Sequence, residues 1–272
     1  MGAQLHGVHA HIKYASFHKR TCKKVAKIAR LFSRRYIMRA LFYFVLAPAL
    51  LPVVLLLFYI YKKDKIEREP LGMILKVFVF GALFSLFDIP SEQAAHSALA
   101  AYYPYADLSF ELAHNFLGIA FIEEVTKWIV LMLFVWRSRE FNYKFDGIVY
   151  AATASLGFAA LENIIYVVSY GTGVAVSRAL FAIPGHASFG ILMGFFFARA
   201  KHFSLAQNYG ASVLCMVLSL ACPIFVHGTY DFLLSPAAHE QSFSSHFFVL
   251  VIALDALAWL IIRHESRTDM PL

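Results

Sequence analysis

The chain alternates long apolar runs with short polar segments. A helix needs about 20 apolar residues to cross the hydrocarbon core of a bilayer. Runs near that length lie at 40–61, 71–89, 115–136, 146–170, 177–198, 209–233 and 245–262. The milder stretch 91–114 contains three tyrosines and is typical of a loop or a helix at the membrane surface. This pattern predicts an all-α, polytopic membrane protein with about seven transmembrane helices.

The polar connections carry an uneven distribution of positive charge. Loops 62–70, 137–145 and 199–208 and the tail 263–272 hold eleven Lys and Arg residues. The alternate connections hold none, apart from Arg178 at a helix edge. Lys and Arg concentrate in cytoplasmic loops. We therefore expect a multi-pass protein of the bacterial inner membrane, with its N-terminus outside and its C-terminal tail in the cytoplasm.

The first 39 residues conflict with this orientation, because they hold ten of the 24 Lys and Arg residues and no acid. One explanation is a basic amphipathic surface helix, with Val25, Ile28 and Leu31 at helical spacing. The other is an upstream extension that is absent from the mature protein, with translation starting near Met38, and we favour this one. The expected organisation is a basic extension over 1–39, a membrane domain over 40–262 and the tail.

Composition excludes several classes of protein. The chain is 60% hydrophobic and 15% charged, whereas soluble domains average about 45–50% apolar and about 25% charged residues. The net charge of +7 belongs to the extension, since the remaining 233 residues hold 14 basic and 17 acidic residues. A nucleic-acid partner is therefore not expected, and the three cysteines form no CxxC motif. The lipid bilayer is the expected environment.

Ionisable residues inside the apolar runs are the candidate functional groups, because burial in hydrocarbon costs several kcal/mol and usually marks function. With about 1.5 Å of rise per residue, the candidate glutamates and histidines fall at similar depth, roughly 9–14 Å from the same side of the membrane, in its outer leaflet; the candidate aspartate lies nearer a helix end. Independent structural charges would not align in this way. The set is Glu123, Glu124, Lys127, Glu162, His186, His227 and Asp231.

The spacing of these residues suits proton transfer. Lys127 can reach both Glu123 and Glu124, holding one carboxylate ionised and leaving the other to exchange protons as a general base. His227 and Asp231 share a helix face, which would fix the tautomer of the imidazole. Such a set predicts an intramembrane hydrolase, and the serine, aspartyl and HExxH metalloprotease signatures are missing from the sequence.

Three motifs resemble those of the PrsW family of intramembrane proteases. EEVTK (123–127) resembles its EExxK motif, FAALE (158–162) its FxxxE motif and HGTYD (227–231) its HxxxD motif. The resemblance covers about residues 45–235 and implies a fold related to the CAAX-prenyl endopeptidases. It also implies cleavage of a membrane-anchored protein near the outer face, as in the first cut of an anti-sigma factor.

The resemblance assigns Glu123, Glu124, Lys127, Glu162, His227 and Asp231 to the catalytic site. It leaves two mechanisms open: water activated by the glutamate pair, or a single zinc ion held by His186, Glu162 and His227. We favour the glutamate mechanism, because paired carboxylates beside a lysine suit proton transfer better than ligation. No organic cofactor is expected.

Two other functions are compatible with the residues. Carboxylate–histidine chains also serve proton-coupled transporters, although the chain has no internal repeat. A non-catalytic relative that binds a membrane partner is the third hypothesis.

Overall fold

The computed structural model describes residues 46–103, 105, 107–240, 243 and 245–272, with a few isolated positions before residue 46. Contacts divide the chain into Met1–Ala47 and Pro48–Leu272, and the fold given below is that of the second unit. The expectations for the basic extension, including the surface helix and the start near Met38, fall outside the described residues.

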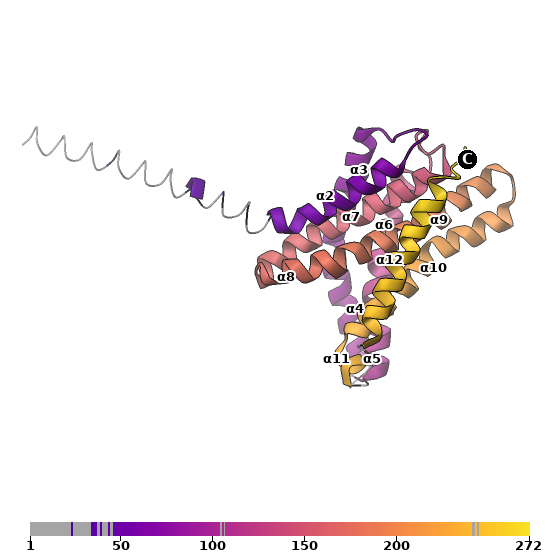
Figure 1. Ribbon diagram of the computed structural model, residues 1–272. Helices are drawn as coiled ribbons and strands as arrows, with labels where there is room; N and C mark the ends of the chain where they lie inside the picture. Colours follow the sequence, from indigo (N-terminus) through magenta and orange to yellow (C-terminus); the bar gives the residue numbers. More distant parts are fainter. Residues whose placement is uncertain are drawn as a thin grey trace, which may run out of the picture. The chain divides into compact units, whose positions relative to one another are not determined.

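The described chain is helical throughout (Figure 1), and an isolated antiparallel bridge between Tyr143 and Pro271 is its one β-type pairing. Backbone groups in hydrocarbon must find hydrogen bonds within their own segment, which favours helices in apolar runs. The longer α-helices are α2 (Ala47–Lys63), α3 (Leu71–Phe84), α4 (Asp88–Tyr102), α6 (Phe121–Phe134), α7 (Lys144–Tyr170), α9 (Ile183–Leu205), α10 (Tyr209–Leu234) and α12 (Ser245–Glu265).

Shorter helical segments connect these elements. A 3₁₀ turn, η2 (Ser85–Phe87), joins α3 to α4, and the short α-helices are α5 (Leu108–Ala113), α8 (Gly173–Ser177) and α11 (Pro236–Glu240). Two π-helical stretches, η3 (His114–Ala120) and η4 (Arg178–Ala182), lead directly into α6 and α9. Because π-helical turns often accompany functional sites, a functional site is expected near the starts of α6 and α9.

Among the described residues, five helices are long and apolar enough to cross a membrane: Leu71–Tyr102, Lys144–Tyr170, Gly173–Leu205, Tyr209–Leu234 and Ser245–Glu265. These support a multi-pass membrane protein, but they do not confirm the expected count of about seven. The described part of the first expected span is α2, which has 17 residues. The third expected span is divided between η3 and the 14-residue α6, which carries Glu123, Glu124 and Lys127.

The stretch 91–114, expected as a loop or surface helix, is mainly helical. It comprises most of α4, which continues directly from α3 through η2, and all of α5. The Asp107 carboxylate caps α5 by accepting hydrogen bonds from the backbone N–H groups of Ser109 and Phe110. This region therefore extends the second span rather than ending it.

Helix α7 is the central element of the unit. It packs against α3 and α9, and α9 packs in turn against α10; Figure 1 shows α7 and α9 running side by side. Close approach depends on glycine: a Cβ on Gly157 would lie 2.1 Å from the backbone oxygen of Phe78, and one on Gly194 would lie 2.3 Å from the oxygen of Gly147. Small residues allow such contact between membrane helices.

The peripheral helices expose large apolar side chains. Val54 and Phe58 on α2, Val217 and Phe225 on α10 and Ile252 on α12 are each more than half exposed. An apolar surface of this kind suits contact with lipid. By contrast, α7 is buried between its neighbours from Phe145 to Ala160, so the polar residues of that stretch face protein.

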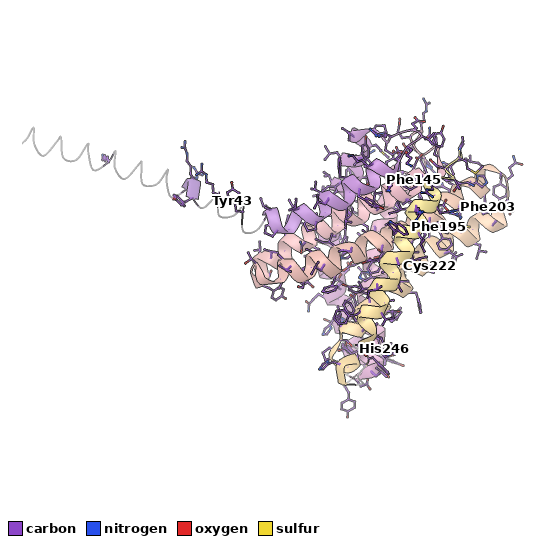
Figure 2. The ribbon with its side chains drawn as sticks, in the orientation of Figure 1. Tyr43, Phe145, Phe195, Phe203, Cys222 and His246 are labelled. Carbon is purple, nitrogen blue, oxygen red and sulfur yellow. The ribbon has the colours of Figure 1, made fainter. Side chains whose placement is uncertain are left out.

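The C-terminal tail folds back onto the start of α7. Asp269 accepts a hydrogen bond from the backbone N–H of Phe145 (labelled in Figure 2), at 2.9 Å. The backbone N–H of Leu272 donates to the oxygen of Asn142 at 2.8 Å. The tail is thus part of the packed unit at this end of α7.

Candidate active site

Helix α6 places three charged side chains in one buried cluster. Lys127 Nζ lies 2.7 Å from Glu124 Oε1 and 3.1 Å from Glu123 Oε2. Residues three and four apart share a helix face, so one ammonium contacts both carboxylates. Glu124 is fully buried and Lys127 is 1% exposed. Because an unpaired buried charge is very costly, this pairing is what allows α6 to carry both acids into the bundle.

His186, on α9, connects this triad to Glu162 on α7. Its Nδ1 atom lies 3.2 Å from Lys127 Nζ, and its Nε2 atom lies 2.9 Å from Glu162 Oε2. A lysine ammonium only donates hydrogen bonds. Nδ1 must therefore accept, and Nε2–H must donate to Glu162. The contacts assign His186 as the neutral Nε2–H tautomer.

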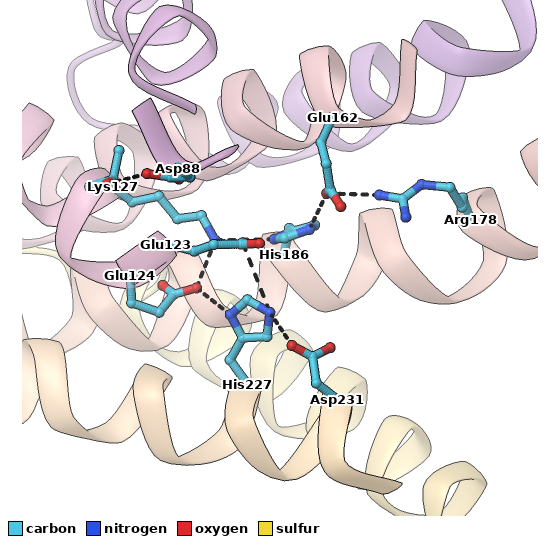
Figure 3. A network of polar contacts seen from close by, with 10 residues as sticks. Asp88, Glu123, Glu124, Lys127, Glu162, Arg178, His186, His227 and Asp231 are labelled. Carbon is cyan, nitrogen blue, oxygen red and sulfur yellow. Dashed lines mark hydrogen bonds and ion pairs between the residues drawn. The ribbon is translucent and has the colours of Figure 1, made fainter. Parts of the chain in front are cut away.

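His227, on α10, has a carboxylate at each ring nitrogen. Nδ1 lies 2.9 Å from Glu124 Oε1, and Nε2 lies 3.2 Å from Asp231 Oδ2. Carboxylates accept hydrogen bonds, so a doubly protonated ring satisfies both contacts. The ring also stacks on Phe189, with centroids 4.5 Å apart. Figure 3 shows His227 between Glu124 and Asp231, and its Nε2 atom also lies 3.9 Å from Glu123 Oε2.

The structure thus brings all seven sequence-predicted residues into one network, drawn in Figure 3. They come from α6, α7, α9 and α10. The expected contacts of Lys127 with its two glutamates, and of His227 with Asp231, are present. The roles of these residues in a reaction stay predictions.

Arg178 also belongs to the network, which the sequence did not predict. Its Nη2 atom lies 2.7 Å from Glu162 Oε2, and its Nε donates to Asn163 Oδ1 at 2.8 Å. Glu162 is therefore held between an arginine and His186. One feature of the sequence could have indicated this role. Arg178 is the one basic residue at the edge of the connections that otherwise contain no Lys or Arg.

Asp88, at the start of α4, is a second residue that the sequence analysis did not select. It is 3% exposed and accepts a hydrogen bond from Thr126 Oγ1 at 2.7 Å. Thr126 lies between Glu124 and Lys127 on α6. Asp88 fell at the end of an expected span, where a charge usually contacts water. The continuation of that helix into α4 instead buries it.

A cavity of about 1060 Å³ opens onto this network. Glu123, His186 and His227 line it, whereas Glu124 and Lys127 lie behind the wall. The two adjacent glutamates therefore differ in position: Glu123 faces the space that a substrate could enter, and Glu124 is enclosed. Aromatic side chains complete the wall, namely Phe158, Tyr166, Phe189 and Tyr230.

The same residues offer a donor set for a metal ion. One ligand atom each from Glu123, Glu124 and His227 lies within 4.8 Å of the other two. Glu124 Oε2 is buried without a hydrogen-bond partner, which leaves an acceptor free for a ligand. Carboxylate oxygens and an imidazole nitrogen are ligands of catalytic zinc, so these residues fit a metal.

The sequence-based metal set was different. It combined His186 and Glu162 with His227, whereas the structure groups Glu123 and Glu124 with His227. The His186 Nδ1 lone pair already accepts from the Lys127 ammonium, and its Nε2–H donates to Glu162. His227 Nδ1 instead faces the Glu124 carboxylate, so its lone pair is available once the ring is neutral. The difference arises because helix packing, rather than spacing along the chain, sets which ligand atoms converge.

Comparison with known proteins places the chain in a family. The model of the PrsW family intramembrane metalloprotease matches residues 69–258. "Protease PrsW" of Geobacillus kaustophilus is 38% identical over 79% of this chain and 88% of its own length. The protein of the same name from Oceanobacillus iheyensis is 36% identical over 82% of this chain and 94% of its own length.

A third relative, "Protease PrsW" of Bacillus subtilis, is 35% identical over 70% of this chain and 83% of its own length. No solved structure gives a significant match. Both the matched family and the relatives are peptidases, and the matched segment contains every residue of the buried network. The chain belongs to the PrsW family of intramembrane metalloproteases and is a membrane-embedded peptidase.

Proposed function

We propose that this peptidase is an endopeptidase that cleaves a membrane-anchored protein at the cavity bounded by Glu123, His186 and His227. The observation that carries the proposal is the different placement of the two glutamates. One carboxylate lines the cavity, and its neighbour is held behind the wall by Lys127 and His227. This arrangement supplies an accessible base beside a fixed charge network.

In this proposal Glu123 accepts a proton from water. The water oxygen bonds to the carbonyl carbon of the scissile peptide, the C–N bond breaks, and the proton passes from Glu123 to the leaving nitrogen. Lys127 Nζ lies 3.1 Å from Glu123 and keeps the carboxylate oriented. Its closer contact with Glu124, at 2.7 Å, leaves Glu123 the less firmly held of the pair.

His227 provides positive charge for the developing oxyanion. Its ring lies between Glu124 and Asp231, which orient it and favour the imidazolium. A charge fixed before the reaction stabilises the transition state more than one that must reorganise. His186 and Glu162 extend the network to Arg178, so both histidines are held by neighbouring acids.

The family description makes a metal ion part of this chemistry. Glu123, Glu124 and His227 would hold it, with His227 then a neutral imidazole in place of the imidazolium of the metal-free description. When bound, it supplies Lewis-acid polarisation of the scissile carbonyl and acidifies water. Asp231 beside His227 Nε2 then fixes the imidazole orientation, as partners of ligating histidines do. The initial preference for a metal-free glutamate mechanism gains no support from the family description.

The proposed substrate is a protein anchored by an apolar segment, cut near the outer face in regulated proteolysis such as the processing of an anti-sigma factor. The aromatic wall of the cavity suits apolar residues. The Lys/Arg-rich connections support a cytoplasmic C-terminus and, with it, an outer-leaflet position for the cluster. Reporter fusions after Leu272 and within 171–176 would test this orientation. A reporter that is active only in the cytoplasm should be active after Leu272 and inactive within 171–176.

The experiment compares membrane-protein fragments from cells that express the parent, Glu123→Gln, or Glu140→Gln. Glu140 is an exposed acid outside the network and serves as the matched control. Fragments of a single-pass protein should appear with the parent and with Glu140→Gln and be lost with Glu123→Gln. Unchanged cleavage by Glu123→Gln would overturn the assignment of the base. Proton uptake into liposomes that depends on Glu123 would instead favour a transporter.

A further inference from the structure

A second buried group of acids lies at the opposite end of α7 from the active site. Asp64 and Glu69 come from the connection between α2 and α3, and Asp146 comes from the first turn of α7. They are 1%, 3% and 0% exposed. Asp146 and Glu162 are sixteen residues apart on one helix, so the two groups are separated by roughly 24 Å.

The three carboxylates converge. One oxygen of each lies within 4.8 Å of the other two. Asp146 Oδ2 accepts hydrogen bonds from the backbone N–H groups of Asn142 (2.9 Å) and Tyr143 (2.6 Å). The Tyr150 hydroxyl donates to Glu69 Oε2. These contacts hold Asp146 and Glu69 in place but satisfy only part of their acceptor capacity.

The Asp64 side chain is the observation that points to a ligand. It is buried among these acids, and neither of its carboxylate oxygens has a hydrogen-bond partner; Asp146 Oδ1 also has none. In the part of the chain that the structure describes, no Lys, Arg or His forms an ion pair with any of the three. Arg68 acts on Asp64 only from beyond ion-pair distance, so three buried acids meet without a directly paired cation, which is unfavourable unless something neutralises them.

We propose that Asp64, Glu69 and Asp146 bind one hard divalent cation, Ca²⁺ or Mg²⁺, that links the α2–α3 connection to the start of α7. An all-oxygen donor set with no nitrogen or sulfur is what these ions prefer, and it differs from the histidine-containing set at the active site. The cation satisfies the free oxygens of Asp64 and Asp146 together and balances the charge.

Protons are the competing occupant. Burial raises the pKa of Asp64 to about 6 and that of Glu69 to about 9. Glu69 and Asp146 can share one proton in a side-chain hydrogen bond. A proton on Asp64 would still need an acceptor, and neither Asp64 oxygen has a hydrogen-bond partner. A cation needs no such donor geometry, which favours the metal.

The consequence is structural. The connection also contacts this end of α7 through Asn142 Nδ2, which donates to Glu67 Oε2 at 3.2 Å. The C-terminal tail contributes Asp269, which accepts from the Phe145 N–H. A cation at the centre of these contacts would hold the α2–α3 connection against the first turn of α7 and make this end of the helix rigid.

The test measures Mn²⁺ binding to the detergent-purified full chain by electron paramagnetic resonance, in a His227→Ala background that removes the active-site imidazole. Binding of about one Mn²⁺ per chain is expected, weakened more than about tenfold by Asp64→Asn, because ligand charge sets affinity. The matched control Glu140→Gln alters an exposed acid outside the three-carboxylate cluster and should bind as the parent does. Ca²⁺ and Mg²⁺ should displace Mn²⁺.

If Asp64→Asn fails to fold, Glu69→Gln is the second variant, because it keeps the shape of the side chain. It should weaken Mn²⁺ binding in the same way. Equal Mn²⁺ binding by Asp64→Asn and its parent would overturn the proposal. So would the absence of binding in the folded parent, which would assign the cluster to shared protons. Peptidase activity does not enter either readout, so the outcome is independent of the proposed function.

Discussion

His227 Nδ1 lies 2.9 Å from Glu124 Oε1, although the two residues are 103 positions apart in the chain. This contact joins α10 to α6 and connects two of the three sequence motifs directly. It also places Glu124 between an imidazole and the Lys127 ammonium, 2.7 Å away. The enclosed glutamate is thus a structural anchor of the network, and its neighbour Glu123 is free to face the cavity.

Replacing Lys127 by Met should destabilise the fold and abolish activity. The change removes the ammonium shared by Glu123 and Glu124 and leaves His227 as their one remaining cationic partner among the described contacts. Breaking a buried ion pair in this way costs about 3–5 kcal/mol. The free energy of unfolding in detergent measures this loss. Adding Glu123→Gln and Glu124→Gln to Lys127→Met should recover most of the stability and none of the activity. A single variant as stable as the parent would contradict the pairing.

Arg178→Gln should lower kcat by about 10–100-fold, the scale of losing a partner that orients a site residue. Arg178 positions Glu162, 2.7 Å away, and through it His186. Arg178→Lys keeps the charge and should recover part of kcat with KM unchanged. Arg199→Gln is the matched control, because Arg199 pairs with Glu265 outside the network. Equal losses of kcat in both Gln variants would point to a general structural effect.

Gly157→Ala should separate α3 from α7. The added methyl would meet the backbone oxygen of Phe78 at 2.1 Å, and overpacking of this kind costs about 1–3 kcal/mol. The measurement is the thermal midpoint of the purified protein. Gly173→Ala provides the control, since a Cβ at that position has no heavy atom within 4 Å, and it should leave the midpoint unchanged. A stable Gly157→Ala protein would show that the helices can shift apart without cost.

Zinc analysis of the purified protein should distinguish the two ligand sets. We expect about one zinc per chain, as in catalytic zinc sites, lost in His227→Ala and retained in His186→Ala. The reason is that the His186 Nδ1 lone pair already accepts from the Lys127 ammonium, whereas His227 belongs to the converging donor set and its Nδ1 faces the Glu124 carboxylate. Loss of zinc in both variants would support the set that includes His186 and Glu162. An active protein free of zinc would support water activation by Glu123 without that metal.

The sequence by itself determined the class of protein and seven of the residues in the buried network. Long apolar runs specify helices because hydrocarbon offers the backbone no other hydrogen bonds. Charges within those runs are expensive enough to stand out, and their matched depth predicted one shared site. The seven candidates, from Glu123 on α6 to Asp231 on α10, do converge.

Only the tertiary structure decided the arrangement within that site. Neighbouring positions on a helix point about 100° apart, so Glu123 and Glu124 cannot both face the cavity. The packing of α6 against its neighbours determines that Glu123 faces the cavity and Glu124 does not. Packing also brings Arg178 to Glu162, and it gathers Asp64, Glu69 and Asp146 from segments far apart in the chain. Depth along a helix can be counted from the sequence; rotation about its axis depends on the neighbouring helices.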